Sequence, residues 1–171
     1  SDLGKETFLD VLNEENAAKL FDAATSALVK WQKASRPGQL PLYDREVLLR
    51  ELNLFPEWYV KRHCGVEWDA KHEKWWQMSV DAILKSNLAD AKVFVHRDFM
   101  PRNFMGVQRH LKVLGIFARI NYRDGKPKYL ADTPRFIKYV RQTAGRYVEL
   151  SPLRHLIDEL DGVRERAGYT F

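Results

Sequence analysis

Apolar residues recur at helical spacing along most of this sequence, and this periodicity is the feature that most constrains its fold. Residues three or four positions apart lie on one face of an α-helix, so such a stripe predicts a helix with one buried side. One stripe consists of Leu20, Phe21, Ala24, Leu28 and Trp31. Five further stripes run between Leu48 and Tyr59, Trp76 and Leu88, Val107 and Ala118, Phe136 and Tyr147, and Leu153 and Leu160. The sequence therefore predicts a domain built almost entirely of helices.

Residues that start or interrupt helices stand where these stripes begin and break. Asn13, Asp44 and Asp69 each precede a stripe, and their side-chain oxygens suit the free N–H groups of a first helical turn. Asp132-Thr133 is followed by proline, which favours the first helical position. Pro56 falls inside the second stripe and is expected to interrupt that helix, because proline has no N–H to donate.

Residues 92–95, Lys-Val-Phe-Val, are the one β-like run and predict a short strand. The run leads into His96-Arg97-Asp98, and Pro101 is expected to keep the residues up to Asn103 in a loop. In phosphoryl transfer, a carboxylate such as that of Asp98 orients the attacking hydroxyl, and an amide such as that of Asn103 helps to hold magnesium against the phosphates. The alternative is that these side chains only cap a turn.

This loop resembles the catalytic loop of the aminoglycoside phosphotransferase superfamily, whose members are small-molecule relatives of the protein kinases. Residues 8–16 with 52–59, and residues 115–126 with 129–135, are similar to bacterial cell-wall-recycling kinases that phosphorylate N-acetylmuramate and N-acetylglucosamine at the anomeric hydroxyl. The resemblance implies an α+β, predominantly helical fold: the C-terminal, larger lobe of a protein-kinase-like structure. It also implies ATP and Mg2+ as cofactors and an amino sugar as the acceptor.

The same resemblance divides the chain and assigns a role to each part. Residues 1–12 would be a hinge remnant and lead-in, 13–90 a helical subdomain, 91–105 the catalytic-loop region and 106–171 the C-terminal helices. Asp98 is implied as the catalytic base, His96 and Arg97 as its supports in the loop, and Asn103 as the magnesium ligand. The residues expected to contact the nucleotide are Asp2, Leu3, Asn103 and Met105.

The sugar is expected between the catalytic loop and the helices around Glu57 and Tyr59. Glu51 is a further candidate, although a glutamate in its position is more often a solvated helix charge. The complete set of candidate substrate residues is Glu51, Glu57, Tyr59, Arg102, Arg119 and Asn121.

The sequence departs from the family pattern in two places. A complete kinase of this type has a small lobe with a phosphate-binding lysine before the hinge, and this sequence starts at the hinge. The family also has a second magnesium-binding Asp shortly after the Asn, and here no acidic residue lies between Asp98 and Asp124. We therefore expect residues to be missing near Met105 to Val107, with Cα atoms much farther apart there than ~3.8 Å. A continuous chain would instead indicate a truncated, inactive protein.

Composition limits the class of protein further. A chain of 171 residues suits one domain, and no apolar run approaches the ~20 residues that a membrane span needs. The single cysteine, Cys64, and the lack of a signal segment at the start predict a protein of the reducing cytoplasm. We expect it to be a monomer that binds no membrane.

The net charge of +5 is unevenly distributed. Five cations and no acidic residue lie between Phe99 and Arg123, namely Arg102, Arg109, Lys112, Arg119 and Arg123. This local charge favours a neutral or acidic acceptor over a cationic one such as an aminoglycoside or choline, which is the second interpretation. A third is a non-catalytic kinase lobe or a nucleic-acid-binding protein, although no recognised nucleic-acid motif is present.

Overall fold

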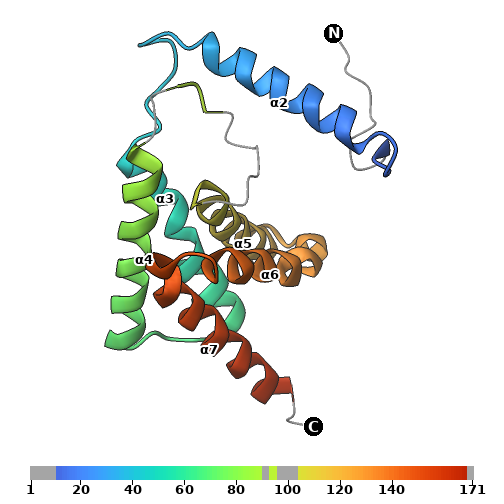
Figure 1. Ribbon diagram of the computed structural model, residues 1–171. Helices are drawn as coiled ribbons and strands as arrows, with labels where there is room; N and C mark the ends of the chain where they lie inside the picture. The colour runs from blue at the N-terminus through green and yellow to red at the C-terminus, as the bar shows by residue number, and fades with distance from the viewer. Residues whose placement is uncertain (1–10, 90–92, 96–103, 169–171) are drawn as a thin grey trace. The chain divides into compact units, whose positions relative to one another are not determined.

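The computed structural model describes residues 11–89, 93–95 and 104–168. For Phe104 and residues 163–168 it describes the backbone alone. The chain divides into two compact units. The first spans residues 1–42 and 91–98, and the second spans residues 43–90 and 99–171. Figure 1 labels the helices of the two units.

The main element of the first unit is helix α2, Ala17–Lys33. Its lead-in is a turn in which Asn13 Oδ1 accepts hydrogen bonds from the backbone N–H groups of Glu15 and Asn16. The predicted stripe is therefore helical, but the helix begins at Ala17, after Asn13 has capped the preceding turn. Side chains of α2 such as Phe21 and Trp31 remain exposed.

The strand predicted at 92–95 is wrong for the three of these residues that are described, Val93 to Val95, which form no strand. The N–H of Phe94 donates to Ser35 Oγ at 2.6 Å, and its ring meets that of Trp31 edge-on, with centroids 5.9 Å apart. A strand needs a ladder partner, and the described part of the chain contains no strand to supply one.

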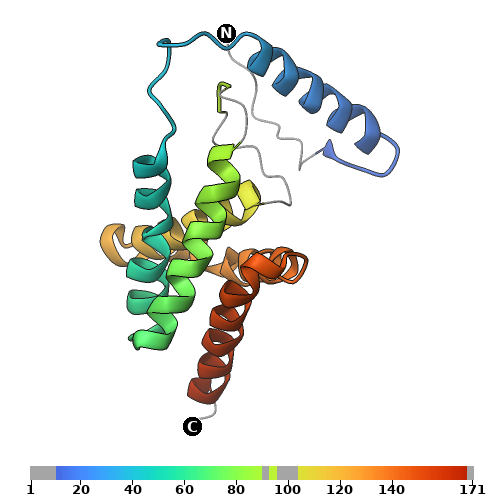
Figure 2. The ribbon, with the colours of Figure 1, turned by 60° about the vertical axis from the view of Figure 1, so that its left-hand side comes forward.

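The second unit contains the remaining helices (Figures 1 and 2). In chain order they are α3 Arg45–Leu52, η1 Phe55–Cys64, α4 Ala70–Ala89, α5 Phe104–Asp124, η2 Pro127–Asp132, α6 Thr133–Ala144, η3 Val148–Leu150 and α7 Ser151–Gly168. Asp44 caps α3 by accepting from the Val47 N–H at 3.1 Å, and Asp69 accepts from the His72 N–H at 3.0 Å, as the sequence predicts. None of the described helices is both long and apolar enough to cross a membrane.

Pro56 breaks the helical hydrogen-bonding pattern as predicted. Helix α3 ends at Leu52, and the following helix η1 is a π-helix of ten residues. Proline cannot donate the hydrogen bond that would continue α3, so the chain restarts with wider turns. The π-helix ends at Gly65, whose φ of 67° is a left-handed conformation that glycine adopts at low cost.

Helix α5 packs against α3, α4, η1, η2 and α6 of the second unit. It is continuous from Phe104 to Asp124, so the predicted break between Met105 and Val107 is not confirmed. Gly115 lies so close to the preceding segment that an added Cβ would stand 2.3 Å from the carbonyl oxygen of Leu54. Only glycine permits this approach between α5 and the start of η1.

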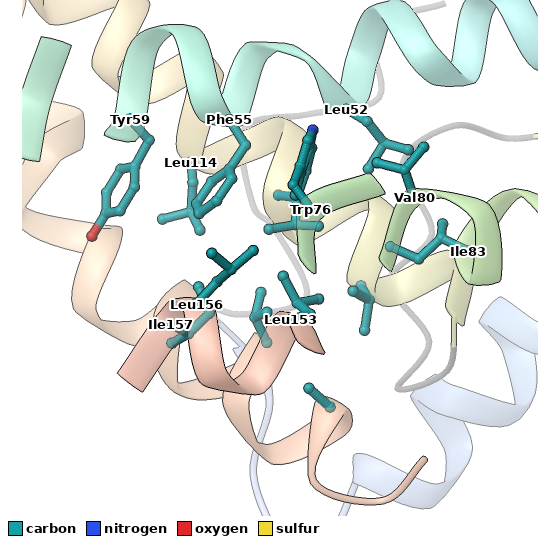
Figure 3. Close-up of a cluster of buried hydrophobic side chains, with 14 of the residues drawn as sticks. Leu52, Phe55, Tyr59, Trp76, Val80, Ile83, Leu114, Leu153, Leu156 and Ile157 are labelled. Atoms are coloured by element: carbon teal, nitrogen blue, oxygen red, sulfur yellow. The ribbon is translucent and has the colours of Figure 1, made fainter. Parts of the chain in front are cut away.

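The core contains the predicted apolar stripes of α4, α5 and α7 (Figure 3). Trp76, Val80, Ile83 and Leu84 of α4 are buried, as are Leu153, Leu156, Ile157 and Leu160 of α7. Leu88 is an exception, because its side chain is 43% exposed. At this end of α4 the buried residue is the preceding one, Asn87. Tyr147 is only half-buried, since α6 ends before it at Ala144.

A polar cluster joins the start of α4 to α7. Glu159 of α7 accepts from His72 Nε2 at 2.6 Å and from Lys71 Nζ at 2.9 Å. The other ring nitrogen of His72 lies 2.6 Å from Asp69 Oδ1. Lys71 lowers the pKa of Glu159, with a further contribution from His72, and the hydrogen bond from the His72 backbone lowers the pKa of Asp69.

Acid is therefore expected to weaken the contact between α4 and α7. A carboxyl group whose pKa is lowered by folding adds stability above its ordinary pKa of 4.5, and loses it as the pH falls through the lower folded value. Thermal unfolding of the wild type and Glu159→Gln at pH 7 and at pH 3 checks this. The variant should be less stable than the wild type at pH 7, and this deficit should be smaller at pH 3. Glu149→Gln, at another exposed carboxylate, is the control; a Glu159→Gln deficit as large at pH 3 as at pH 7 would contradict the assignment.

Candidate functional site

Most residues of the predicted catalytic and nucleotide site lie outside the described residues. These are Asp2, Leu3, His96, Arg97, Asp98, Arg102 and Asn103, and their roles remain predictions. Met105 is described: it lies in the first turn of α5 and is half-buried. Helix α5 begins at Phe104, the residue that follows Asn103 in the sequence.

Glu51 of α3 is a buried carboxylate that accepts from Tyr43, Gln108 and Lys112, three donors in the described part of the chain. The residue is 5% exposed, so it is not the solvated helix charge that a glutamate in such a position usually is. Its Oε2 accepts from the hydroxyl of Tyr43 at 2.5 Å and from Gln108 Nε2 at 3.0 Å. Its Oε1 accepts from Lys112 Nζ at 2.7 Å. Burial of a charge is costly unless it is paired and hydrogen-bonded, and these contacts meet both conditions.

The packing of α3 against α5 brings this cluster together. Gln108 and Lys112 are four residues apart, and positions at that spacing lie on one face of a helix. The Lys112 side chain is only 16% exposed, so its charge is offset by Glu51 within the protein. The run of cations predicted from the sequence therefore presents less positive charge than its count suggests.

Glu57 and Tyr59, the candidates in η1, have opposite environments. Tyr59 is 1% exposed and stacks on Phe55, with ring centroids 5.4 Å apart. Its other neighbour is His63, with a centroid distance of 5.3 Å. Glu57 is exposed. Tyr59 thus belongs to the core shown in Figure 3, and a role in sugar binding stays a prediction for both residues.

Arg119 and Asn121 lie in the second half of α5, and both are half-buried. The Nε of Arg119 is buried and has no hydrogen-bond partner among the residues that the structure describes, which leaves a donor for another group. Nearby, Tyr122 approaches His63 with its hydroxyl 3.2 Å from Nδ1. The contacts of Glu51 and those of His63 fall about ten residues apart on α5, which is about 15 Å along a helix. The structure therefore places the contacts of Glu51 and those of His63 in two separate regions along α5.

The partners of Glu51 were not predicted from the sequence. Gln108 and Lys112 share one face of a predicted helix, but nothing in their spacing indicates which acidic residue they meet. One feature of the sequence did indicate such a contact. The stretch from Phe99 to Arg123 has no acidic residue, so a cation that is buried there must pair with a carboxylate from another part of the chain. No group of three His, Cys, Asp or Glu side chains able to hold a metal occurs in the described part of the chain.

Comparison with known proteins supplies the identity of the family. Residues 1–117 match the model of the phosphotransferase enzyme family. The N-acetylmuramate/N-acetylglucosamine kinase of Pseudomonas aeruginosa is 37% identical, over 94% of this chain and 68% of that kinase. The kinase of the same name from Pseudomonas putida is 36% identical, over 93% of this chain and 68% of its own length. No solved structure matches the chain.

A third relative of the same name, from Neisseria meningitidis serogroup B, is 37% identical over the whole of this chain and 74% of its own length. That alignment extends over 247 residues, although this chain has 171. The relatives are enzymes by name, and their alignments cover 93–100% of this chain. The chain belongs to the phosphotransferase enzyme family.

Proposed function

We propose that the protein transfers the γ-phosphoryl group of ATP to a hydroxyl of an amino sugar, N-acetylmuramate or N-acetylglucosamine, at the anomeric position. The observation that carries this proposal is the set of three kinases of that name, each 36–37% identical over nearly the whole chain. The loop sequence supports it, because an Asp and an Asn five residues apart suit phosphoryl transfer. Asp98 is the proposed base, supported by His96 and Arg97.

ATP and Mg2+ are the proposed cofactors. Mg2+ prefers oxygen ligands, and Asp98 and Asn103 offer a carboxylate and an amide oxygen. Asp2, Leu3 and Met105 are the proposed contacts of the nucleotide. The oxygen ligands of Asp98 and Asn103 suit Mg2+, but the family pattern includes a second carboxylate that this sequence lacks. In the second half of α5, near Asn121, the Nε of Arg119 could donate a hydrogen bond to an oxygen of the substrate.

The single cysteine favours the reducing cytoplasm as the place of the reaction.

An Asp98→Ala variant tests the catalytic assignment. The complete product of the natural gene is incubated with ATP, Mg2+ and either N-acetylmuramate or N-acetylglucosamine, and sugar phosphate is measured. Loss of a general base lowers the rate by about 10²–10⁴-fold, so the variant should fall by that factor. Asp81→Ala, which changes an exposed aspartate of α4, serves as the control.

Two outcomes would contradict the proposal: no turnover of either sugar by the wild type, or an Asp98→Ala variant as fast as the wild type. Turnover of a cationic aminoglycoside or choline in preference to the sugars would instead favour the second enzymatic interpretation.

We further propose that a segment is absent from the sequence near Met105 to Val107. The alignment with the Neisseria meningitidis kinase supports the absence of a segment, because it uses all 171 residues of the chain but extends over 247. About 76 aligned positions thus have no residue in this chain, the difference between those two lengths. The second reason is the missing carboxylate, which the family carries shortly after the Asn.

Tryptic peptides of the protein purified from its natural source test this second proposal. Trypsin cleaves after Arg102 and Arg109, so a continuous chain yields the peptide of residues 103–109. We expect that peptide to be missing, while residues 113–119 and 93–97, which trypsin releases on either side, are detected. Detection of the 103–109 peptide at comparable yield would show that the chain is continuous there.

A further inference from the structure

We propose that the apolar side of helix α2 is the docking surface for the segment absent from the sequence near Met105 to Val107, and that this segment packs a helix against it. The inference rests on the proposed absence of that segment, and it does not depend on which acceptor the enzyme phosphorylates. The apolar side of α2 is the stripe predicted from the sequence, which consists of Leu20, Phe21, Ala24, Leu28 and Trp31.

This stripe differs from the other predicted stripes because none of its members is buried. Phe21 is 61% exposed and Trp31 is 46% exposed, and α2 contains no buried residue at all. By contrast, Leu153, Leu156 and Leu160 of the α7 stripe are buried. The residues on the opposite side of α2 are polar: Lys19, Ser26, Lys30 and Lys33. The sequence of α2 thus has the pattern of a helix with one covered side, and the structure leaves that side exposed.

Helix α2 needs a partner for its own stability. Isolated helices shorter than about 12–15 residues are marginal in water, and most helical stability in proteins comes from packing of the apolar side. Local stabilisation of α2 is small, because its N-cap residue, Asn16, makes no side-chain capping hydrogen bond and its first turn has no acidic residue. Burial of the stripe would supply the stability that these local contacts do not.

The contacts of Phe94 indicate which part of the chain lies against this helix. Its N–H donates to Ser35 Oγ, just after α2, and its ring meets that of Trp31 at the end of the stripe. Met105 follows Phe94 by 11 positions, which at ~3.3 Å per residue extend to about 36 Å. The 17 residues of α2 rise only about 26 Å. A segment inserted near Met105 therefore has enough chain before it to reach every turn of the stripe.

The length of the absent segment also suits this surface. About 76 aligned positions have no residue in this chain, whereas a helix as long as α2 takes 17. A helix packed on α2 at the usual interaxial distance of about 8–10 Å would cover the rings of Phe21 and Trp31. Because the segment belongs to the same chain, it meets α2 at a high effective concentration, which favours it over a second copy of the protein.

Phe21→Ala in the complete product of the natural gene tests the docking, with Ser26→Ala on the polar side of the same helix as the matched control. Alanine has the highest helix propensity, so at an exposed position either change would leave the thermal unfolding temperature equal or slightly raised. If the stripe is covered, Phe21→Ala removes a buried ring and should lower this temperature by about 5 °C or more, whereas Ser26→Ala should not. An unfolding temperature that Phe21→Ala leaves unchanged or raises would overturn the docking.

A photoreactive phenylalanine analogue in place of Phe21 identifies the occupant, and this measurement does not depend on a variant that loses a ring. After irradiation of the purified complete protein, we expect cross-linked peptides within one molecule that join α2 to sequence outside these 171 residues. The same analogue in place of Ser26 should give about tenfold less of this product, since that position lies on the opposite side of the helix.

The other outcomes of the cross-linking experiment each overturn the proposal. Cross-links confined to the 171 residues, a cross-linked species of twice the mass, or no cross-link from position 21 would mean that the absent segment does not cover α2. Failure of the absent segment itself is read separately, from detection of the tryptic peptide of residues 103–109. Failure of the phosphotransferase function is read from the absence of sugar phosphate.

Discussion

The close packing of α5 against the segment that begins η1 is the contact on which the second unit depends. Gly115 allows it, because any side chain at this position would collide with the backbone of Leu54. The two helices meet along the apolar residues of both, with Phe55, Tyr59 and Leu114 buried between them (Figure 3). Helices α3, α4 and α6 also pack on α5, so a displacement of α5 would disturb the packing of each of these helices.

Within this apolar packing, Glu51 and its partners form a small polar region near the start of α5. A buried ion pair is not by itself a strong source of stability, since desolvation offsets much of the attraction. Its effect here is on geometry: Lys112 and Gln108 are joined to α3 at one place on the helix. His63 packs near the other end of α5, where its Nδ1 lies 3.2 Å from the hydroxyl of Tyr122.

The sequence predicted the helices well because their stripes and caps are local signals. Asp44, Asp69 and Pro56 act within a few residues of themselves, and the structure confirms the position of each. The strand at 92–95 could not be predicted in this way, because a strand depends on a partner elsewhere in the chain. The contacts of Glu51 are likewise non-local, and its burial follows from how α3 meets α5. For the candidate site, the motif from His96 to Asn103 indicated the chemistry and the comparisons confirmed the family, but the positions of its side chains depend on tertiary structure.

The stability of Gly115→Ala relative to Gly162→Ala is the most direct test of the central contact. Both glycines lie in helices, where alanine is favoured by about 1 kcal/mol, but a Cβ at Gly162 would meet nothing within 4 Å. Urea unfolding should show that Gly162→Ala is neutral or more stable than the wild type. Gly115→Ala should lose about 1–3 kcal/mol, the usual cost of overpacking a core. A Gly115→Ala variant that gains stability as Gly162→Ala does would contradict the account, because α5 would then not be held against Leu54.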